Sequence, residues 1–400
     1  MIRRDRYLSQ IEPFVGKDVI KVLTGMRRSG KSTLLEAIRE ELVSAGVPRS
    51  SILSMSFESL RWEKAAASCH AFYEEAASFA GEVDGKAYLF FDEVQQVDQW
   101  ERAVNSLRID FDCDIYLTGS NSKLLSGELA TLLGGRYVTF EVFPFSLREL
   151  AQALPDLGRD ALFERYRILG GMPFLSSIDY APESSASYLR DVFNSIVLKD
   201  IVQRHGFRNS DQLERILAYF MSEVGTTYSV DNVVNVLRQE KRTISVDSVY
   251  NYLQAAEDAM LLTRVKRYDL KGKAVLRGGE KAYLTDVGLR EALLGSNESR
   301  VELVMENLVF CELRRRGYAV YVGRLGEREI DFVAEKGGKR AYFQVAYLLA
   351  SEKTLHRELS AFDGIDDNFP KVVVSMDPID FSRNGIRHCN IVDLLLSEGW

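Results

Sequence analysis

Cysteine is scarce in this chain of 400 residues, and the spacing of the four cysteines excludes the usual metal centres. Cys69, Cys113, Cys311 and Cys389 stand far apart, and no two of them have the short separation of zinc ligands. We therefore expect reduced thiols in an intracellular protein rather than a disulfide framework.

Long apolar runs and an excess of positive charge are missing as well. The first residues, MIRRDRYLSQ, lack the apolar core of a signal peptide, and no apolar run approaches the roughly 20 residues of a membrane helix. The chain carries 51 Lys and Arg against 58 Asp and Glu, which excludes a generally basic coat for nucleic acid but leaves a local basic patch open. These absences predict a cytoplasmic protein without a membrane partner.

The remaining composition is that of a globular protein, long enough for two or three domains. In the first third, short apolar runs alternate with amphipathic segments, which is typical of a parallel sheet with crossover helices. We expect strands at residues 19–24, 51–57, 87–91, 114–119 and 136–142, and helices at 31–46 and 98–109. The fold class is therefore α/β.

The later parts of the chain have different patterns. Residues 158–207 are expected to be helical on both sides of a turn at LGGMPF (169–174). Three closely spaced helices within 211–262, followed by a two-stranded segment with turn glycines, predict a winged helix. A last α/β unit is expected from helices at 301–316 and 352–362, three strands between them, a strand at 371–376 and a closing helix.

The stretch from Gly25 to Ser32 fits the pattern G-x-x-x-x-G-K-[ST] and lies between a predicted strand and a predicted helix. Glycines let the backbone N–H groups wrap phosphates, while the start of a helix favours an anion. Lys31 would reach the β- and γ-phosphates of ATP, and the Ser32 hydroxyl would ligate Mg²⁺. The expected nucleotide contacts are Gly25, Met26, Arg27, Arg28, Ser29, Gly30, Lys31, Ser32, Thr33 and, more distantly in sequence, Asn121.

Two acidic residues end the apolar strand of YLFFDEV. Asp92 is placed to hold Mg²⁺ through water, and Glu93 is placed to orient or activate the attacking water. The alternative is that both residues cap the following helix. With the phosphate loop upstream, we favour catalysis, and Glu beside Asp favours hydrolysis over a pure nucleotide switch.

Ser120, Asn121 and Arg136 are further candidates for the nucleotide site. In LTGSNS, Ser120 or Asn121 would contact the γ-phosphate or the water, although a simple turn explains the same residues. Arg136, in LLGGRY, is either an arginine finger that neutralises transition-state charge in a neighbouring subunit or a solvated surface arginine.

The ordered set TGMRRSGKSTLL, FFDEVQQVDQWERAVNSL, YLTGSNSKLLSG, LLGGRYVTFEVFPFSLREL and LGGMPF resembles the AAA-type bacterial and archaeal ATPases that carry a C-terminal domain of unknown function. LKDIVQRHGFRN, YDLKGKAVL, KAYLTDVGLR, ENLVFCELRRRGYAVYVGR and EIDFVAE resemble that C-terminal domain. The resemblance covers nearly the whole chain, although only the phosphate loop is specific when taken alone.

The resemblance implies an AAA-type P-loop core at residues 1–157, a helical linker or lid at 158–209, a winged helix at 210–292 and a restriction-endonuclease-like α/β domain at 293–400. It implies the roles given above for Lys31, Asp92 and Glu93. It also favours Arg136 as a finger acting in trans, and thus a homo-oligomer such as a ring or hexamer.

A nuclease site of that last kind needs a helix carboxylate, an Asp on a strand, and Glu-x-Lys on the next strand. Glu306 and Asp331 supply the first two, but the third element is Gln344-Val345-Ala346. Gln344 brings no negative charge to a metal, and Ala346 brings no charge at all. Nothing in the sequence positions Lys339 or Lys353 as a replacement. We expect a degenerate site that binds or docks without cutting.

The segment 264–281 is basic and would follow the winged helix as its wing. Its cations could pin nucleic-acid phosphates without reading sequence, or they could be a solvated face. By contrast, no Lys or Arg lies between Thr243 and Thr263, so arginine–guanine contacts are not available from the expected recognition helix. Asn251 and Gln254 remain as polar candidates there. The candidate phosphate contacts are Arg264, Lys266, Arg267, Lys271, Lys273 and Arg277.

Two functions remain open from the sequence. In the first, an oligomeric ATPase engages DNA through its C-terminal modules. In the second, those modules bind a partner protein, and ATP hydrolysis resets a regulatory complex. An ATP-powered nuclease is a lesser third alternative.

Overall fold

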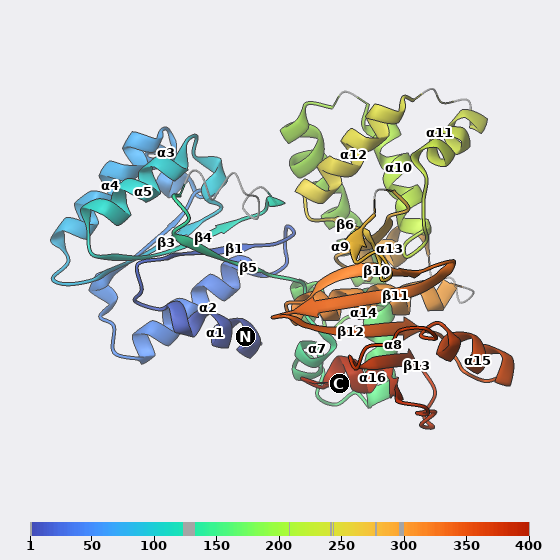
Figure 1. Ribbon diagram of the computed structural model, residues 1–400. Coiled ribbons are helices and arrows are strands. Elements are labelled where there is room, and N and C mark those ends of the chain that lie inside the picture. Colours follow the sequence, from blue (N-terminus) through green and yellow to red (C-terminus); the bar gives the residue numbers. More distant parts are fainter. Residues whose placement is uncertain are drawn as a thin grey trace. The chain divides into compact units, whose positions relative to one another are not determined.

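A computed structural model of the protein describes residues 2–122, 133–207, 209–240, 242, 244–276, 278–295 and 300–399. The chain divides into two compact units, Met1–Phe143 with Asp258–Met260, and Pro144–Glu257 with Leu261–Trp400 (Figure 1). Within the described ranges, no helix combines the length and the apolar character that crossing a bilayer requires.

The first unit contains the five-stranded parallel sheet that the sequence predicts. Its strands are β1 (Ile20–Thr24), β2 (Ile52–Ser56), β3 (Ala87–Asp92), β4 (Cys113–Gly119) and β5 (Tyr137–Glu141), in the order β2-β3-β4-β1-β5. Both β1 and β4 are buried along their whole length. Strands buried on both faces are mainly apolar, and the one charged residue of each strand, Lys21 of β1 and Asp114 of β4, forms a buried ion pair with the other.

Helices cover both faces of this sheet. They are α1 (Asp5–Ile11), α2 (Lys31–Ser44), α3 (Glu63–Ala66), α4 (Cys69–Glu82) and α5 (Trp100–Asp110), with short 3₁₀ turns at Glu12–Phe14, Arg49–Ser51, Leu60–Trp62 and Val94–Gln96. Helices α1 and α2 lie on one face, and α4 and α5 lie on the other (Figure 1).

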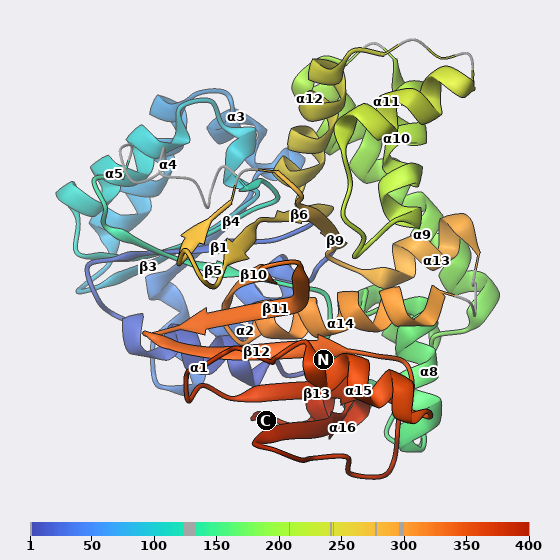
Figure 2. The same ribbon diagram turned by 45° about the vertical axis from the view of Figure 1, so that its right-hand side comes forward.

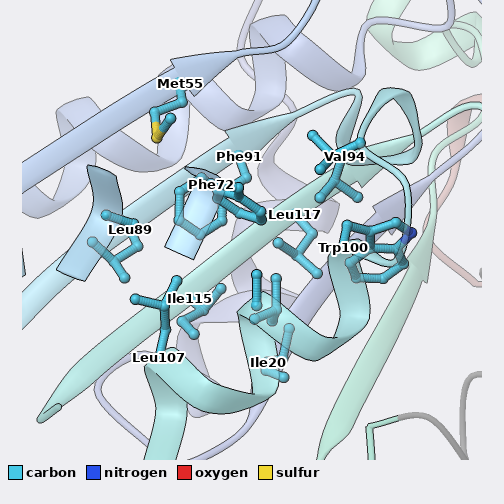
Figure 3. Close-up of a cluster of buried hydrophobic side chains, with 14 of the residues drawn as sticks. Ile20, Met55, Phe72, Leu89, Phe91, Val94, Trp100, Leu107, Ile115 and Leu117 are labelled. Atoms are coloured by element: carbon cyan, nitrogen blue, oxygen red, sulfur yellow. The ribbon is translucent and has the colours of Figure 1, made fainter. Parts of the chain in front are cut away.

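Side chains of each strand point alternately to the two faces of the sheet, so the core has one part on each face. Leu89 and Phe91 of β3 pack with Phe72 of α4 and Trp100 of α5, as Figure 3 shows, while Phe90 points to the side of α1 and α2. Successive side chains of a strand point to opposite faces, so one apolar run fills both layers.

The second unit begins with helices. These are α7 (Leu147–Ala153), α8 (Arg159–Leu169), α9 (Pro182–Ser195), α10 (Ser210–Ser222), α11 (Val230–Gln239), α12 (Val246–Asp258), α13 (Val287–Leu294), α14 (Val301–Arg315), α15 (Glu352–Ser360) and α16 (Ile391–Leu396), with a 3₁₀ segment at Pro173–Ile178 and a π-helical segment at Ile196–Gln203. Helices α10, α11 and α12 form one group (Figure 2). The helical stretch around LGGMPF is confirmed, with α8 ending at Leu169.

The strands of this unit form a small and a large sheet. They are β6 (Leu262–Val265), β7 (Arg267–Asp269), β8 (Ala274–Val275), β9 (Lys281–Leu284), β10 (Ala319–Leu325), β11 (Arg328–Lys336), β12 (Lys339–Val345), β13 (Lys371–Ser375) and β14 (Ile386–Asn390). Strands β6 and β9 pair with each other, and the others form a mixed sheet in the order β14-β13-β12-β11-β10-β7-β8.

The basic segment therefore differs from the simple two-stranded wing that we expected. Its two ends pair as β6 and β9, but its middle forms the β7–β8 hairpin, and β7 runs parallel to β10 in the larger sheet. Strand β14 was not expected, because IRHCN is a short, largely polar sequence at the edge of the sheet.

A buried carboxylate joins distant parts of the second unit. Oδ2 of Asp286 accepts a 2.8 Å hydrogen bond from the Gly171 N–H, and Oδ1 accepts one of the same length from the Gly288 N–H. Gly170 has φ 68°, and a Cβ there would lie 2.0 Å from Oδ1 of Asp286. Burial raises the pKa of Asp286 to about 6, against the hydrogen bonds from Gly171 and Gly288, which lower it. The glycine pair and Asp286 thus depend on each other.

Candidate functional site

The phosphate loop connects β1 to α2 at the carboxyl end of the parallel strands, where ligands of α/β sheets bind. Gly30 precedes the helix with φ 95°, and Arg28 also adopts a left-handed conformation at φ 67°. Gly25 is required by close packing, because a Cβ there would lie 2.2 Å from the Val142 carbonyl oxygen. The motif therefore forms a connecting loop whose conformation depends on Gly25 and Gly30.

The side chains of this loop divide into buried and exposed groups. Lys31 is buried and donates to the carbonyls of Gly25 at 3.0 Å and Met26 at 3.2 Å. The Ser29 hydroxyl is buried and finds no hydrogen-bond partner within the described part of the chain. Arg28, Ser32 and Thr33 are exposed, and Arg27 pairs with Glu58 at 3.4 Å.

Asp92 ends β3 beside the start of α2. Its carboxylate accepts hydrogen bonds from Ser32 at 2.9 Å, Thr118 at 2.5 Å and Ser56 at 3.4 Å. Burial raises the pKa of Asp92, and the bonds from Thr118 and Ser32 oppose that rise. A hydroxyl and a carboxylate side by side are oxygen donors of the type that Mg²⁺ prefers, so these residues fit the cation that a P-loop site uses.

Glu93 follows directly, in a left-handed conformation with φ 54°. Its carboxylate accepts hydrogen bonds from Ser120, at 3.1 Å, and from Gln95, and it lies 3.7 Å from the Lys31 ammonium. Burial would raise the pKa of Glu93, but the charge of Lys31 and these hydrogen bonds outweigh it and lower the pKa. Glu93 therefore stays ionised near neutral pH, as an acceptor of a proton must be.

These contacts do not support the alternative that Asp92 and Glu93 only cap the following helix. The 3₁₀ turn at Val94–Gln96 receives no side-chain cap bond from Glu93 in the described structure, and Asp92 is directed to Ser32. Both carboxylates face the phosphate loop.

The residues after β4 reach the same place. Ser120 is buried and donates to Glu93. Asn121 is nearly buried, and its backbone carbonyl accepts a 3.1 Å hydrogen bond from Thr24, the last residue before the phosphate loop. The structure thus gathers Lys31, Asp92, Glu93 and Ser120 at one edge of the sheet.

Arg136 lies at the other end of these strands, where the amino ends of β1 and β5 are paired. It precedes β5, where its carbonyl accepts a 3.0 Å hydrogen bond from Ile20, the first residue of β1. The phosphate loop begins five residues further on, after Thr24, which is roughly 16 Å away at the rise of a strand. The Arg136 guanidinium is exposed and forms a 3.5 Å ion pair with Asp18.

Sequence reasoning missed Arg4. This buried residue of the N-terminal segment donates to the carbonyls of Ser29 at 3.1 Å and Phe143 at 2.8 Å. Its guanidinium lies 4.5 Å from the ring of Tyr7, whose hydroxyl accepts a hydrogen bond from the Phe143 N–H. Arg4 therefore joins the phosphate loop to the end of β5. No motif signals this role, because both partners are backbone atoms far away in the sequence.

The three residues of the degenerate nuclease-like site do come together in the second unit. Glu306 on α14, Asp331 on β11 and Gln344 on β12 line one cavity of about 400 Å³. Oε1 of Gln344 accepts a 3.3 Å hydrogen bond from the Asp331 N–H. Neither Lys339 nor Lys353 lines this cavity within the described chain. Burial and the charge of Glu306 raise the pKa of Asp331 well above its usual range.

The basic segment has fewer free cations than its sequence suggests. Arg264 pairs with Glu257, Arg267 pairs with Glu329, and Lys281 is buried. Lys266, Lys271 and Lys273 are exposed. Arg277, the remaining candidate, lies outside the described residues.

Comparison with known proteins matches residues 17–151 to the family described as AAA domain and residues 160–300 to the Domain of unknown function (DUF8612). An uncharacterized protein of Haemophilus influenzae is 37% identical over 403 residues, covering 99% of each chain. An uncharacterized protein of Methanocaldococcus jannaschii is 27% identical over 395 residues, covering 94% of this chain and 85% of the other. Among solved structures, the Walker-type ATPase of Pyrococcus abyssi shares the fold, with TM-score 0.52 and 15% identity over 73% of this chain and 96% of that one.

Proposed function

Because the chain belongs to the family of AAA-type P-loop ATPases that carry this C-terminal domain of unknown function, we propose that it binds ATP with Mg²⁺ and hydrolyses it. The observation that carries the proposal is the meeting of Ser32 with Asp92 and of Lys31 with Glu93 at the carboxyl edge of the sheet. These four side chains come from two separate segments and have complementary chemistry.

Each residue has a role that follows from its place. Backbone N–H groups from Gly25 to Ser32 hold phosphate oxygens, and Lys31 adds a positive charge to them. Ser32 and Asp92 hold Mg²⁺, which when bound neutralises charge on the phosphates. Glu93 orients the attacking water and accepts its proton, while Ser120 holds the Glu93 carboxylate in place.

Two variants test this division of roles. Lys31→Ala should lose binding of a fluorescent ATP analogue, whereas Glu93→Gln should retain binding and lose steady-state phosphate release. Glu82→Gln, at an exposed glutamate that ends α4, is the matched control and should behave like wild type. Turnover by Glu93→Gln at the wild-type rate would disprove the role of Glu93.

We propose further that Arg136 serves the site of a neighbouring subunit in a homo-oligomer, such as a ring or hexamer. Its position at the other end of the strands supports this, because the guanidinium cannot reach the phosphate loop of its own chain without rearrangement of β5. Its exposed pair with Asp18 leaves it accessible to another chain.

For the C-terminal part we propose the division into a lid (158–209), a winged helix (210–292) and a restriction-endonuclease-like domain (293–400), which follow the ATPase core (1–157). Helices α10 to α12 with β6 and β9 support the winged helix. We propose that these modules engage DNA through Lys266, Lys271 and Lys273 and do not cut it. Mg²⁺-dependent nicking of plasmid that disappears in Asp331→Ala would overturn the second part.

The alternative is a partner protein. The exposed face of α12 presents Val246, Asp247, Tyr250, Asn251 and Gln254, with no cation among them. ATP hydrolysis measured with duplex, single-stranded and branched DNA at low and moderate salt separates the two functions. Stimulation that fades with salt and is lost in Lys271→Glu with Lys273→Glu supports DNA, whereas indifference to every DNA supports the partner protein.

A further inference from the structure

Lys281 occupies an unusual place for a residue of a basic segment. It begins β9 and is 4% exposed. Its Nζ lies 2.8 Å from Oε1 of Glu329, 2.9 Å from Oε1 of Glu306 and 3.8 Å from Oδ1 of Asp331. Burying an ammonium is costly unless carboxylates surround it, and here three of them do.

The same carboxylates have other partners inside the protein. Tyr283, two residues after Lys281, donates to the oxygen of Glu306 that also faces Lys281. Oδ2 of Asp331 accepts a 2.8 Å hydrogen bond from the Val345 N–H. Oε2 of Glu329 pairs with Arg267. Two cations, Lys281 and Arg267, thus contact these three carboxylates, and each carboxylate has at least one oxygen engaged by a protein donor.

A divalent metal ion does not fit this donor set. Mg²⁺ requires oxygen ligands at about 2.0–2.1 Å in a near-octahedral arrangement, and carboxylates are its main protein ligands. Here Lys281 lies between Glu306 and Glu329, and Gln344 replaces a carboxylate with a neutral amide. In the part of the chain that the structure describes, no three acidic, histidine or cysteine side chains are arranged to hold a metal.

We propose that the Lys281 ammonium is the resident cation of this carboxylate cluster, in the place where a hydrolytic site of this architecture would hold a metal. The cluster comprises Lys281, Glu306, Glu329 and Asp331. It joins β9 to α14 and β11 by charge, and its cavity takes no divalent cation while the lysine is present. This inference does not depend on ATP hydrolysis by the first unit.

Binding of Mn²⁺ to the full-length protein without nucleotide tests the inference, with free Mn²⁺ measured by electron paramagnetic resonance. Wild type, Glu306→Gln and Asp331→Asn should bind equal amounts, because neither carboxylate holds a metal. Lys281→Met should gain about one Mn²⁺ per chain, as a vacated carboxylate cluster permits. Adding Glu306→Gln to Lys281→Met should remove that gain.

Several outcomes would overturn the inference. Wild-type protein that binds Mn²⁺ and loses it in Glu306→Gln or Asp331→Asn holds a metal beside the lysine. A folded Lys281→Met that gains no Mn²⁺ shows that the lysine does not stand in the place of a cation. If Lys281→Met does not fold, the comparison of wild type with the two carboxylate variants still decides. Lys271→Met, at an exposed lysine of the same segment, should change nothing.

Discussion

The hydroxyl of Ser32, at the start of α2, donates a 2.9 Å hydrogen bond to the carboxylate of Asp92, at the end of β3. Sixty positions of sequence separate the two residues, yet the parallel sheet brings the ends of their segments together. This pair marks the point at which the phosphate loop meets the acidic residues.

Ser32→Ala and Asp92→Asn should each lower kcat for ATP by on the order of 100-fold, because each removes an oxygen donor for Mg²⁺. The double variant should be little worse than either single one, since the two residues act as a unit. Steady-state phosphate release across a Mg²⁺ titration measures this, with Ser44→Ala at the exposed end of α2 as the control. Fully additive losses would contradict a shared cation.

Arg4→Met should raise KM for ATP about tenfold while changing kcat less, because Arg4 holds the Ser29 carbonyl and so fixes the shape of the phosphate loop. Arg4→Lys should recover part of the loss. Arg3→Met is the matched control, since Arg3 is exposed and pairs with Asp5 and Glu41. Unchanged KM in a folded Arg4→Met would remove Arg4 from the site.

Mixed oligomers should reveal the direction in which Arg136 acts. Glu93→Gln chains and Arg136→Ala chains are each expected to be inactive. Co-expressed and purified through two different tags, they should recover about a quarter of wild-type activity, because half of the sites keep Glu93 and half of the neighbours keep Arg136. Arg102→Ala, at an exposed arginine of α5, should be active alone. A mixture without recovery would place the finger within its own chain or elsewhere.

The raised pKa of Asp286 gives a pH dependence with a definite sign. The folded protein binds a proton at Asp286 up to about pH 6, whereas the ordinary pKa of an aspartate carboxyl is 3.8. Between these values the folded state holds more protons, so this carboxyl makes stability fall as pH rises, by about 3 kcal/mol in all. This loss of stability is complete only at pH values well above 6.

Asp286→Asn removes this titration. It also places an amide where Gly171 or Gly288 needs an acceptor, so the variant should be less stable than wild type. The difference in free energy of unfolding should be larger near pH 4.5 than near pH 7.5, as urea titrations would measure. Asp156→Asn, at an exposed position, should show no such trend. A difference independent of pH would show that Asp286 titrates at its ordinary value.

Much of the first unit could be predicted because its signals are local. Buried strands such as β1 and β4 are mainly apolar runs, and the phosphate loop has a specific spacing. The acidic pair Asp92 and Glu93 follows a strand whose end is visible in the sequence. The parallel pairing of β3, β4 and β1 then places both residues beside the loop, so the order of the strands is enough to predict their position.

The rest depended on contacts between residues far apart in sequence. Arg4 binds backbone carbonyls, which have no sequence signature. The sequence predicts Lys281 as one more cation of a wing, yet its partners Glu306, Glu329 and Asp331 lie on other elements. Strand β14 lies at the edge of its sheet and pairs with β13 on one side. Its sequence is therefore largely polar and lacks the apolar pattern by which buried strands are predicted.

The close approach of Val142 to Gly25 has a consequence for anyone who would transplant the phosphate loop. The loop packs against Val142, which lies more than a hundred positions later in the sequence. Arg4, from the N-terminal segment, donates hydrogen bonds to Ser29 of the loop and to Phe143 beside Val142. A graft of the twelve residues Thr24 to Leu35 onto another scaffold would carry the motif without the contacts from Val142 and Arg4 that shape it. The unit that can be transferred is the loop together with the segments that carry Arg4 and Val142. Recombination between homologues that separates these segments should yield chains that fold but have a distorted phosphate loop.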